Sequence, residues 1–185
     1  MGMVHTLGLD RDAIAPRLVA GDQSRFSLRS DLLPDHPVRV GAVAEELPTI
    51  PDALAAFASR NNAMAVAALP QIEGSVREAI ERFGAARVGV VMGTSTSGVS
   101  DAERAIAHHL ETDELAPDFD YAQLEFGGIG EFVARHLGAA GPCYVMSTAC
   151  SSGARALASA RSLIRLGLCD AVVAGAADTL CGLTV

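Results

Sequence analysis

Short apolar runs alternate with amphipathic stretches over the second half of the chain. Three runs lack polar alternation: Arg87–Met92, Tyr144–Met146 and Ala171–Ala174. Such runs predict strands buried on both faces, as in parallel sheets. A helical period predicts helices between and after them, at Ser100–Leu110, Gly130–Leu137 and Gly153–Gly167. Strands that alternate with helices in this way predict an α/β fold with a mostly parallel sheet and helices on both faces.

The first half carries weaker patterns. Asp10–Ala20 is predicted to be a helix, and Val38–Val43 a strand. Ser59–Phe83 is helical in pattern and its first residue can cap it. Pro70 lacks an N–H and clashes with the preceding turn, so we expect a break or kink there. Gly84 follows this helix as a natural stop.

A cysteine among small residues separates the predicted strand Tyr144–Met146 from the following helix. Cys150 falls at the strand-to-helix turn. There, unpaired N–H groups and the helix dipole stabilise a thiolate and can hold an oxyanion. This placement makes Cys150 a candidate nucleophile. The spacing equally allows a buried structural cysteine with Ser147 or Thr148 as the helix cap, so both interpretations stay open at this point.

The helix predicted after Cys150 has two contrasting faces. One apolar face is predicted from the spacing of Gly153, Leu157, Ala160 and Ile164. Arg161 and Arg165 are four residues apart and share another face. That second face could contact a partner subunit, but we favour the interpretation that it is solvated.

Three blocks of sequence resemble one enzyme family. Ser147–Ala154, together with Asp170–Asp178, resembles the nucleophile region of beta-ketoacyl-[acyl carrier protein] synthases. Val88–Gly98 resembles the strand and glycine-rich loop that those enzymes carry upstream. The order and separation of the blocks also fit. The resemblance is specific over Arg87–Val185 and looser over Gly2–Phe83.

The resemblance implies a thiolase-like layered α/β fold, of which residues 1–185 are the N-terminal half. In that family a longer strand precedes the segment that starts at Gly2, and the chain continues for about the same length again. The implied site residue is Cys150, which would accept an acyl group from an acyl carrier protein. A malonyl-carrier substrate would then be decarboxylated and attack this thioester. The resemblance places the histidines and lysine that support this step in the other half, so we expect these residues alone not to complete the condensation.

The implied protein is a cytoplasmic homodimer of fatty acid or polyketide biosynthesis, without a cofactor or metal. One alternative is a non-catalytic partner subunit of a condensing enzyme, although such subunits usually lose the cysteine that this chain keeps. Another is a thiolase-type acyltransferase that uses coenzyme A. The sequence Ser147–Thr148–Ala149 ahead of Cys150 resembles the carrier-protein synthases more closely.

Composition excludes several other classes. The 185 residues carry a net charge of −8, which argues against a nucleic-acid surface. Every basic residue other than histidine is arginine, so lysine Schiff-base chemistry is excluded within this sequence. No apolar run approaches the ~18 residues of a membrane span. The four cysteines show no paired metal spacing, and without a secretory signal they are predicted to be reduced thiols.

Other conspicuous residues receive plainer interpretations. Gly93 and Gly98 have the spacing of a phosphate loop, but Val99 stands where that motif needs lysine. His108 and His109 are adjacent on a predicted helix and point in different directions, so no family role is assigned to them. Asp178 is either a hydrogen-bonding carboxylate or a cap for the next segment. The remaining cysteines are predicted to pack in the core: Cys143, Cys169 and Cys181.

Overall fold

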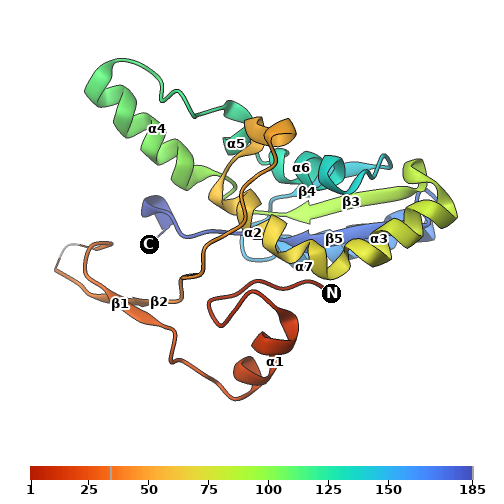
Figure 1. Cartoon of the computed structure of the whole chain (residues 1–185), viewed down its shortest axis with the longest axis horizontal. Helices are drawn as coiled ribbons and strands as arrows, with labels where there is room; N and C mark the ends of the chain where they lie inside the picture. Colours follow the sequence, from red (N-terminus) through yellow and green to blue (C-terminus); the bar gives the residue numbers. More distant parts are fainter. Residues whose placement is uncertain (34, 185) are drawn as a thin grey trace.

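A sheet of three parallel strands forms the centre of the computed structural model, which describes residues 1–33 and 35–184. The strands are β3 (Val88–Gly93), β4 (Cys143–Met146) and β5 (Ala171–Ala176), in the order β4-β3-β5 (Figure 1). Gly93 lies opposite both Met146 and Ala176 in the two ladders. All three strands therefore end at one edge, called here the carboxyl edge.

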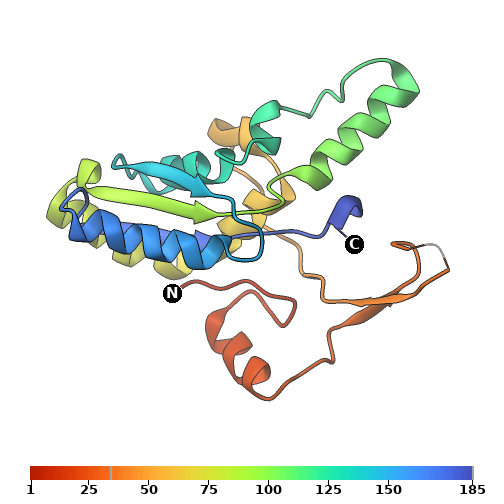
Figure 2. The same cartoon turned by 180° about the vertical axis from the view of Figure 1, so that it is seen from behind.

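Helices cover both faces of this sheet, as predicted. On one face lie α2 (Arg60–Ala68), α3 (Pro70–Phe83) and α6 (Gly128–Leu137), and on the other lies α7 (Ser152–Arg165) (Figures 1 and 2). The central strand supplies side chains to both sides, since Val90 and Met92 join the first cluster and Val91 joins the second. β3 is buried along its whole length.

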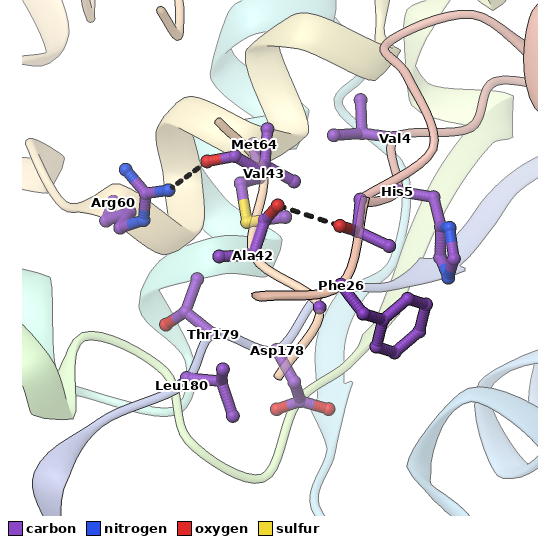
Figure 3. Close-up of a pocket in the computed structure, with 12 residues that line it drawn as sticks. Val4, His5, Phe26, Ala42, Val43, Arg60, Met64, Asp178, Thr179 and Leu180 are labelled. Carbon is purple, nitrogen blue, oxygen red and sulfur yellow. Dashed lines mark hydrogen bonds between the residues drawn. The ribbon is translucent and has the colours of Figure 1, made fainter. Parts of the chain in front are cut away.

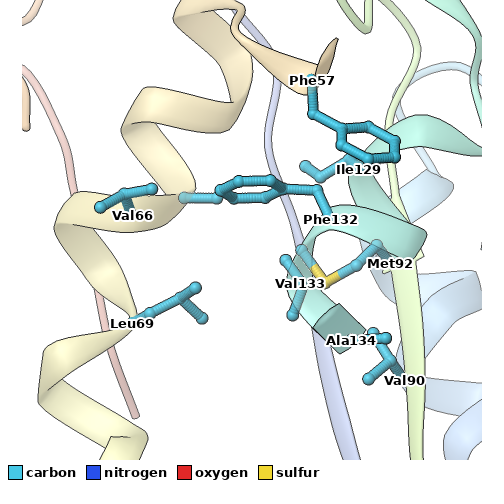
Figure 4. Close-up of a cluster of buried hydrophobic side chains, with 10 residues drawn as sticks. Phe57, Val66, Leu69, Val90, Met92, Ile129, Phe132, Val133 and Ala134 are labelled. Carbon is cyan, nitrogen blue, oxygen red and sulfur yellow. The ribbon is translucent and has the colours of Figure 1, made fainter. Parts of the chain in front are cut away.

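The larger core cluster is built around Phe132 of α6 (Figure 4). Its ring is fully buried and lies 6.3 Å from that of Phe57, centroid to centroid. Phe57 ends the 3₁₀ helix η1 (Asp52–Phe57), and Val66 and Leu69 close the cluster from the other side. This packing fixes α2 and α6 against the sheet.

The long helix predicted over Ser59–Phe83 is interrupted where expected. α2 ends at Ala68, and α3 begins at Pro70, where the missing N–H needs no partner. The Ser59 hydroxyl accepts from the Asn62 N–H at 3.2 Å and caps α2. Gly84 ends α3 with a φ of 83°, which a residue with a side chain rarely adopts.

The N-terminal region lies beside this core. It contains α1 (Arg11–Val19) and an antiparallel hairpin of β1 (Ser27–Arg29) and β2 (Val38–Val40). The strand predicted over Val38–Val43 therefore ends three residues early. Gln71 of α3 ties the region down, because its amide nitrogen donates to the carbonyls of residues 3 and 9 at 3.1 and 2.9 Å.

The segment between β3 and β4 begins with α4 (Val99–Thr112), which points away from the sheet (Figure 1). An acidic connection leads to α5 (Tyr121–Leu124) and then to α6. Two further 3₁₀ turns complete the described elements, η2 (Ala85–Arg87) and η3 (Gly182–Thr184). Among the described residues, no helix is both long and apolar enough to cross a bilayer.

Two burial predictions were wrong. β4 and β5 are half-buried rather than buried, because each is an edge strand of the described sheet. The buried face of α7 is also rotated by about one residue from the predicted one and consists of Ser152, Ala156, Ala160 and Leu163. Leu157 and Ile164 are instead 60% and 47% exposed. The smaller side chains on the buried face let α7 lie close to β3.

The exposed side of α7 has two parts. Leu157 borders an apolar pocket of about 520 Å³ between β5, α2 and the first residues of the chain. Arg161 and Arg165 are exposed in this single chain, which both interpretations of that face allow. A helix that is apolar on more than its buried face can thus mislead a prediction made from periodicity alone.

Candidate active site

Three loops meet at the carboxyl edge of the sheet. They follow β3, β4 and β5 and comprise residues 94–98, 147–151 and 177–181. The Thr94 N–H donates to the Met146 carbonyl at 3.2 Å, and the Ala177 N–H donates to the Gly93 carbonyl at 3.1 Å. The loop after β3 is therefore bonded to the end of β4, and the loop after β5 is bonded to the end of β3. Ligands of open parallel sheets bind at this kind of edge.

The loop after β4 presents Cys150 two residues before α7 begins. Cys150 is exposed among the described residues, which contradicts the burial that the structural interpretation expected. The helix cap is Ser151, not Ser147 or Thr148. The residue ahead of the cysteine, Ala149, has a φ of 53° in the left-handed region, which is unfavourable for a residue with a Cβ.

Two serine hydroxyls hold this turn. The Ser151 hydroxyl donates to the Thr148 carbonyl at 2.7 Å. The Ser152 hydroxyl donates to the Ala149 carbonyl at 2.6 Å and accepts from the Thr148 N–H at 2.9 Å. Ser152 is buried and Ser151 is exposed, so the two bonds of Ser152 are partly shielded from water and that of Ser151 is not. They explain how the left-handed backbone at Ala149 is maintained and why Cys150 faces outward.

Gly93, the last residue of β3, lets the start of α7 approach. A Cβ added at Gly93 would lie 2.7 Å from the carbonyl carbon of Ser152 and 2.9 Å from the nitrogen of Gly153. Both are backbone atoms, which cannot move aside without shifting the helix. The glycine that looked like part of a phosphate loop is therefore a packing contact beneath the cysteine turn.

Asp178, in the loop after β5, binds the loop after β3. Its Oδ1 accepts from the backbone N–H groups of Ser95 and Thr96 at 2.6 and 2.9 Å. Of the two interpretations of Asp178, the hydrogen-bonding carboxylate is confirmed. Burial raises the pKa of Asp178, but the hydrogen bonds from Ser95 and Thr96 outweigh it and leave the pKa below the ordinary value of 3.8.

A pocket of about 340 Å³ lies beside this loop (Figure 3). Asp178 and Thr179 line it together with residues of the N-terminal segment and α2. The Thr6 hydroxyl donates to the Ala42 carbonyl at 2.8 Å, and a terminal nitrogen of Arg60 donates to the Val43 carbonyl at 3.0 Å. These bonds fix segment 41–43 as one wall.

The other cysteines lie away from Cys150. Cys169 and Cys181 are buried, as predicted, but Cys143 is exposed on the edge strand β4, so the core prediction was wrong for it. The Cys143 sulphur faces Gly130 of α6, and burial followed by the charge of Glu131 raises the pKa of this thiol. Cys143 is thus exposed as a residue, although its sulphur atom is partly shielded from solvent.

The histidines predicted to have no catalytic role lie outside the three loops. His108 and His109 are on α4, half-buried and exposed respectively. The ring of His136 packs on Phe132 with 5.8 Å between centroids. In the part of the chain that the structure describes, no cluster of three or more His, Cys, Asp or Glu residues could hold a metal ion.

Sequence reasoning missed the polar partners of the loops. Ser95 and Thr96 give no motif signal, because their role depends on an acceptor more than 80 residues away. Glu103 of α4 is a second case, since its carboxylate accepts from the N–H groups of Gly182 and Leu183 at 2.9 and 2.8 Å. Only the glycine-rich composition of 93–98 hinted that this loop lies against another part of the chain.

Comparison with known proteins places this arrangement in a family. The family described as "Beta-ketoacyl synthase, N-terminal domain" matches residues 10–184. A polyketide beta-ketoacyl synthase of Streptomyces virginiae is 35% identical over 99 residues, which are 50% of this chain and 24% of that protein.

Solved structures agree with this match. A chain from the complex of the ketosynthase ApeO with its chain length factor ApeC, from Xenorhabdus doucetiae, is 42% identical with a TM-score of 0.92. It matches 98% of this chain and 46% of its own length, so the present chain spans about half of that relative.

A further solved structure shares the fold at 18% identity and a TM-score of 0.71, covering 97% of this chain and 49% of its own. That structure is AntDE:AntF, a type II PKS acyl-carrier protein in complex with its ketosynthase bound to the hexaketide. The thiolase-like α/β fold expected from the sequence is confirmed by these neighbours. On the family match over nearly all of its residues, the chain belongs to the beta-ketoacyl synthase family.

Proposed function

We propose that Cys150 is the acyl acceptor of a polyketide-type beta-ketoacyl synthase, which joins an acyl group to a malonyl unit on an acyl carrier protein. One observation carries the proposal: an exposed cysteine lies on a strained turn at the start of α7, at the carboxyl edge of a parallel sheet. A structural cysteine needs neither the exposure nor the strain.

The first half-reaction follows from this geometry. The Cys150 thiolate attacks the carbonyl carbon of the carrier thioester, and a tetrahedral oxyanion forms. We assign stabilisation of that oxyanion to the backbone N–H of Cys150 itself and to the positive end of α7. The carbon–sulphur bond to the carrier then breaks, and the carrier thiolate leaves and takes a proton. The acyl group remains on Cys150 as a new thioester.

The polyketide assignment is supported by the relatives. The Streptomyces protein is a polyketide synthase component by name, and the Xenorhabdus structure pairs a ketosynthase with a chain length factor. The AntDE:AntF complex, which contains an acyl-carrier protein, supports such a protein as the partner. We extend both features to this protein, with a homodimer or a dimer with a related subunit as its assembly.

The same proposal assigns residues 1–185 to the N-terminal half of the synthase domain. The chain covers 46% of its Xenorhabdus relative, which supports this assignment. We expect acylation of Cys150 to be within reach of these residues, whereas decarboxylation of the malonyl group needs groups from the second half. Mixing the chain with acyl- and malonyl-carrier proteins should therefore give an acyl adduct but no condensed product.

The test is an intact-mass measurement after incubation with acetyl-carrier protein. The wild-type chain and Cys143→Ala should gain one acetyl group, and Cys150→Ala should gain none. An adduct that persists in Cys150→Ala would overturn the proposal. A folded wild-type chain that gains no acetyl group would instead favour the non-catalytic partner subunit, the role suggested by the chain length factor in the Xenorhabdus complex.

A further inference from the structure

One carboxylate oxygen of Asp178 gathers an unusual number of donors. Besides the N–H groups of Ser95 and Thr96, the hydroxyls of Thr94, Ser95 and Thr96 each lie 3.1 Å from Oδ1. Two successive backbone N–H groups that point at one oxygen form an anion-binding concavity. Here the anion is supplied by the chain itself, from the loop after the neighbouring strand.

The loop that Asp178 binds is strained and closely tied. Ser97 has a φ of 44°, in the left-handed region. Its N–H donates to the Thr94 hydroxyl at 2.9 Å, and its own hydroxyl donates to the Glu125 carbonyl at 3.0 Å. The Thr179 N–H also donates to the Thr96 hydroxyl at 3.1 Å. Removing the carboxylate would leave two N–H groups without this acceptor in a strained loop.

This loop touches both ends of the cysteine turn. At the entry to the turn, the Thr94 N–H bonds to the carbonyl of Met146, the last residue of β4. At its exit, Gly93 lies so close to the backbone of Ser152 and Gly153 that a Cβ added there would come within 2.7 Å and 2.9 Å of their atoms. A displacement of residues 93–97 therefore has two direct routes to Cys150.

We propose that Asp178 is a positioning residue for Cys150: by fixing the loop after β3, it holds the cysteine turn in the geometry that keeps the thiol at the start of α7. The inference rests on the proposed role of Cys150 and adds a residue from the third loop to the same site. Asp178 does not touch the reacting atoms and acts through residues 93–97.

The experiment measures alkylation of Cys150 and Cys143 by iodoacetamide in the same 185-residue chain, with each peptide quantified by mass spectrometry. Asp178→Ala should slow Cys150 about tenfold, because the thiolate loses its alignment with the helix N-terminus. Asp178→Asn keeps an oxygen that can accept the two N–H groups and should recover most of the loss, to a rate about two- to threefold below wild type. Cys143 should react at one rate in all variants.

Asp170→Ala is the matched control. It removes a carboxylate at the other end of β5, where the partner is Arg87. It should leave the Cys150 rate unchanged, which a general loss of stability would not do. If Asp178→Ala does not fold, Asp178→Asn still tests the idea, because its Ser95 and Thr96 amides should exchange faster with deuterium while the Cys150 rate falls measurably.

Two results would overturn the inference: an unchanged Cys150 rate in a folded Asp178 variant, or an equal loss in Asp170→Ala. Alkylation needs no acyl substrate, so the two proposals fail separately. A wild-type chain that takes no acetyl group but still responds to Asp178→Ala would count against the proposed function only.

Discussion

The two edges of the parallel sheet share their strands and register but differ in chemistry. At the carboxyl edge, two residues with a Cβ, Ser97 and Ala149, adopt left-handed backbone, and Cys150 is exposed. At the amino edge, Arg87 is bonded to the Asp170 carboxylate at 2.6 Å and to the carbonyls of residues 167 and 168. There, Cys169 is buried, and burial raises the pKa of its thiol.

The difference shows which constraints are structural and which are chemical. Both edges contain a glycine against backbone, since a Cβ at Gly141 would lie 2.6 Å from the Val88 carbonyl oxygen. Close packing is therefore common to both. Backbone strain combined with an exposed cysteine, among the described residues, occurs only at the carboxyl edge. Strain that the surroundings must maintain is typical of functional sites.

The sharpest test of the comparison pairs the two glycines. Gly93→Ala and Gly141→Ala should each reduce the free energy of unfolding by about 1–3 kcal/mol, because the new Cβ meets backbone that must shift. Only Gly93→Ala should also change the alkylation rate of Cys150. Urea unfolding and peptide mass spectrometry measure the two effects.

Gly74→Ala serves as the control for the pair. Gly74 lies within α3, and a Cβ there meets nothing within 4 Å. This variant should be more stable than wild type by about 0.5–1 kcal/mol. Equal changes in Cys150 reactivity from Gly93→Ala and Gly141→Ala would remove the distinction between the edges.

A second prediction compares cysteines from the two edges. At pH 7, Cys143 should be alkylated several-fold more slowly than Cys150, because burial and the Glu131 carboxylate raise the pKa of the Cys143 thiol. Glu131→Gln removes the charge and should speed Cys143 without affecting Cys150. The reverse order of rates in the folded wild-type chain would contradict the assignment of Cys150 as the reactive thiol.

A third prediction concerns acid stability. The pKa of Asp178 lies below 3.8 in the folded chain, so its ionised form favours folding. This contribution is complete above the ordinary pKa and is lost as pH falls through the lower folded value. Below about pH 4, the Tm of wild type should therefore fall more steeply with decreasing pH than that of Asp178→Asn. Parallel Tm curves would show that the carboxylate bonds contribute little.

The smallest effect is expected at the amino edge. Arg87 and Asp170 are 40% and 42% exposed, so solvent screens their ion pair. Arg87→Ala should therefore lower the Tm only slightly, and 0.5 M NaCl should reduce the difference in Tm between wild type and the variant. A larger loss would mean that the arginine bonds to the two carbonyls matter more than its charge.

The sequence predicted what depends on local pattern. β3 follows from its run of apolar residues, and the break at Pro70 follows from the missing proline N–H. The turn at Cys150 follows from the small residues between strand and helix. The buried face of α7 was predicted wrongly, because hydrophobicity favours burial of Leu157 and exposure of Ser152. In the structure Ser152 is buried and Leu157 is exposed.

Long-range polar contacts could not be predicted in the same way. Nothing near Ser95 in sequence indicates that its N–H will meet Asp178, and Cys143 shows no local sign of lying on an edge strand. Sheet order decides both, and sheet order is a property of the assembled fold.

The strand order also determines when the site can form. β3 can pair fully only after β4 and then β5 have been synthesised, because they are its two neighbours in the sheet. The hydrogen bonds of Asp178 join residues 82–84 positions apart in sequence. Contacts between such distant residues form slowly, because the chain entropy of a long loop is lost before the contact compensates for it. During synthesis, Cys150 leaves the ribosome before Asp178 does. We therefore expect its turn to remain unsettled until β5 is added, so Cys150 reaches its exposed position late in folding.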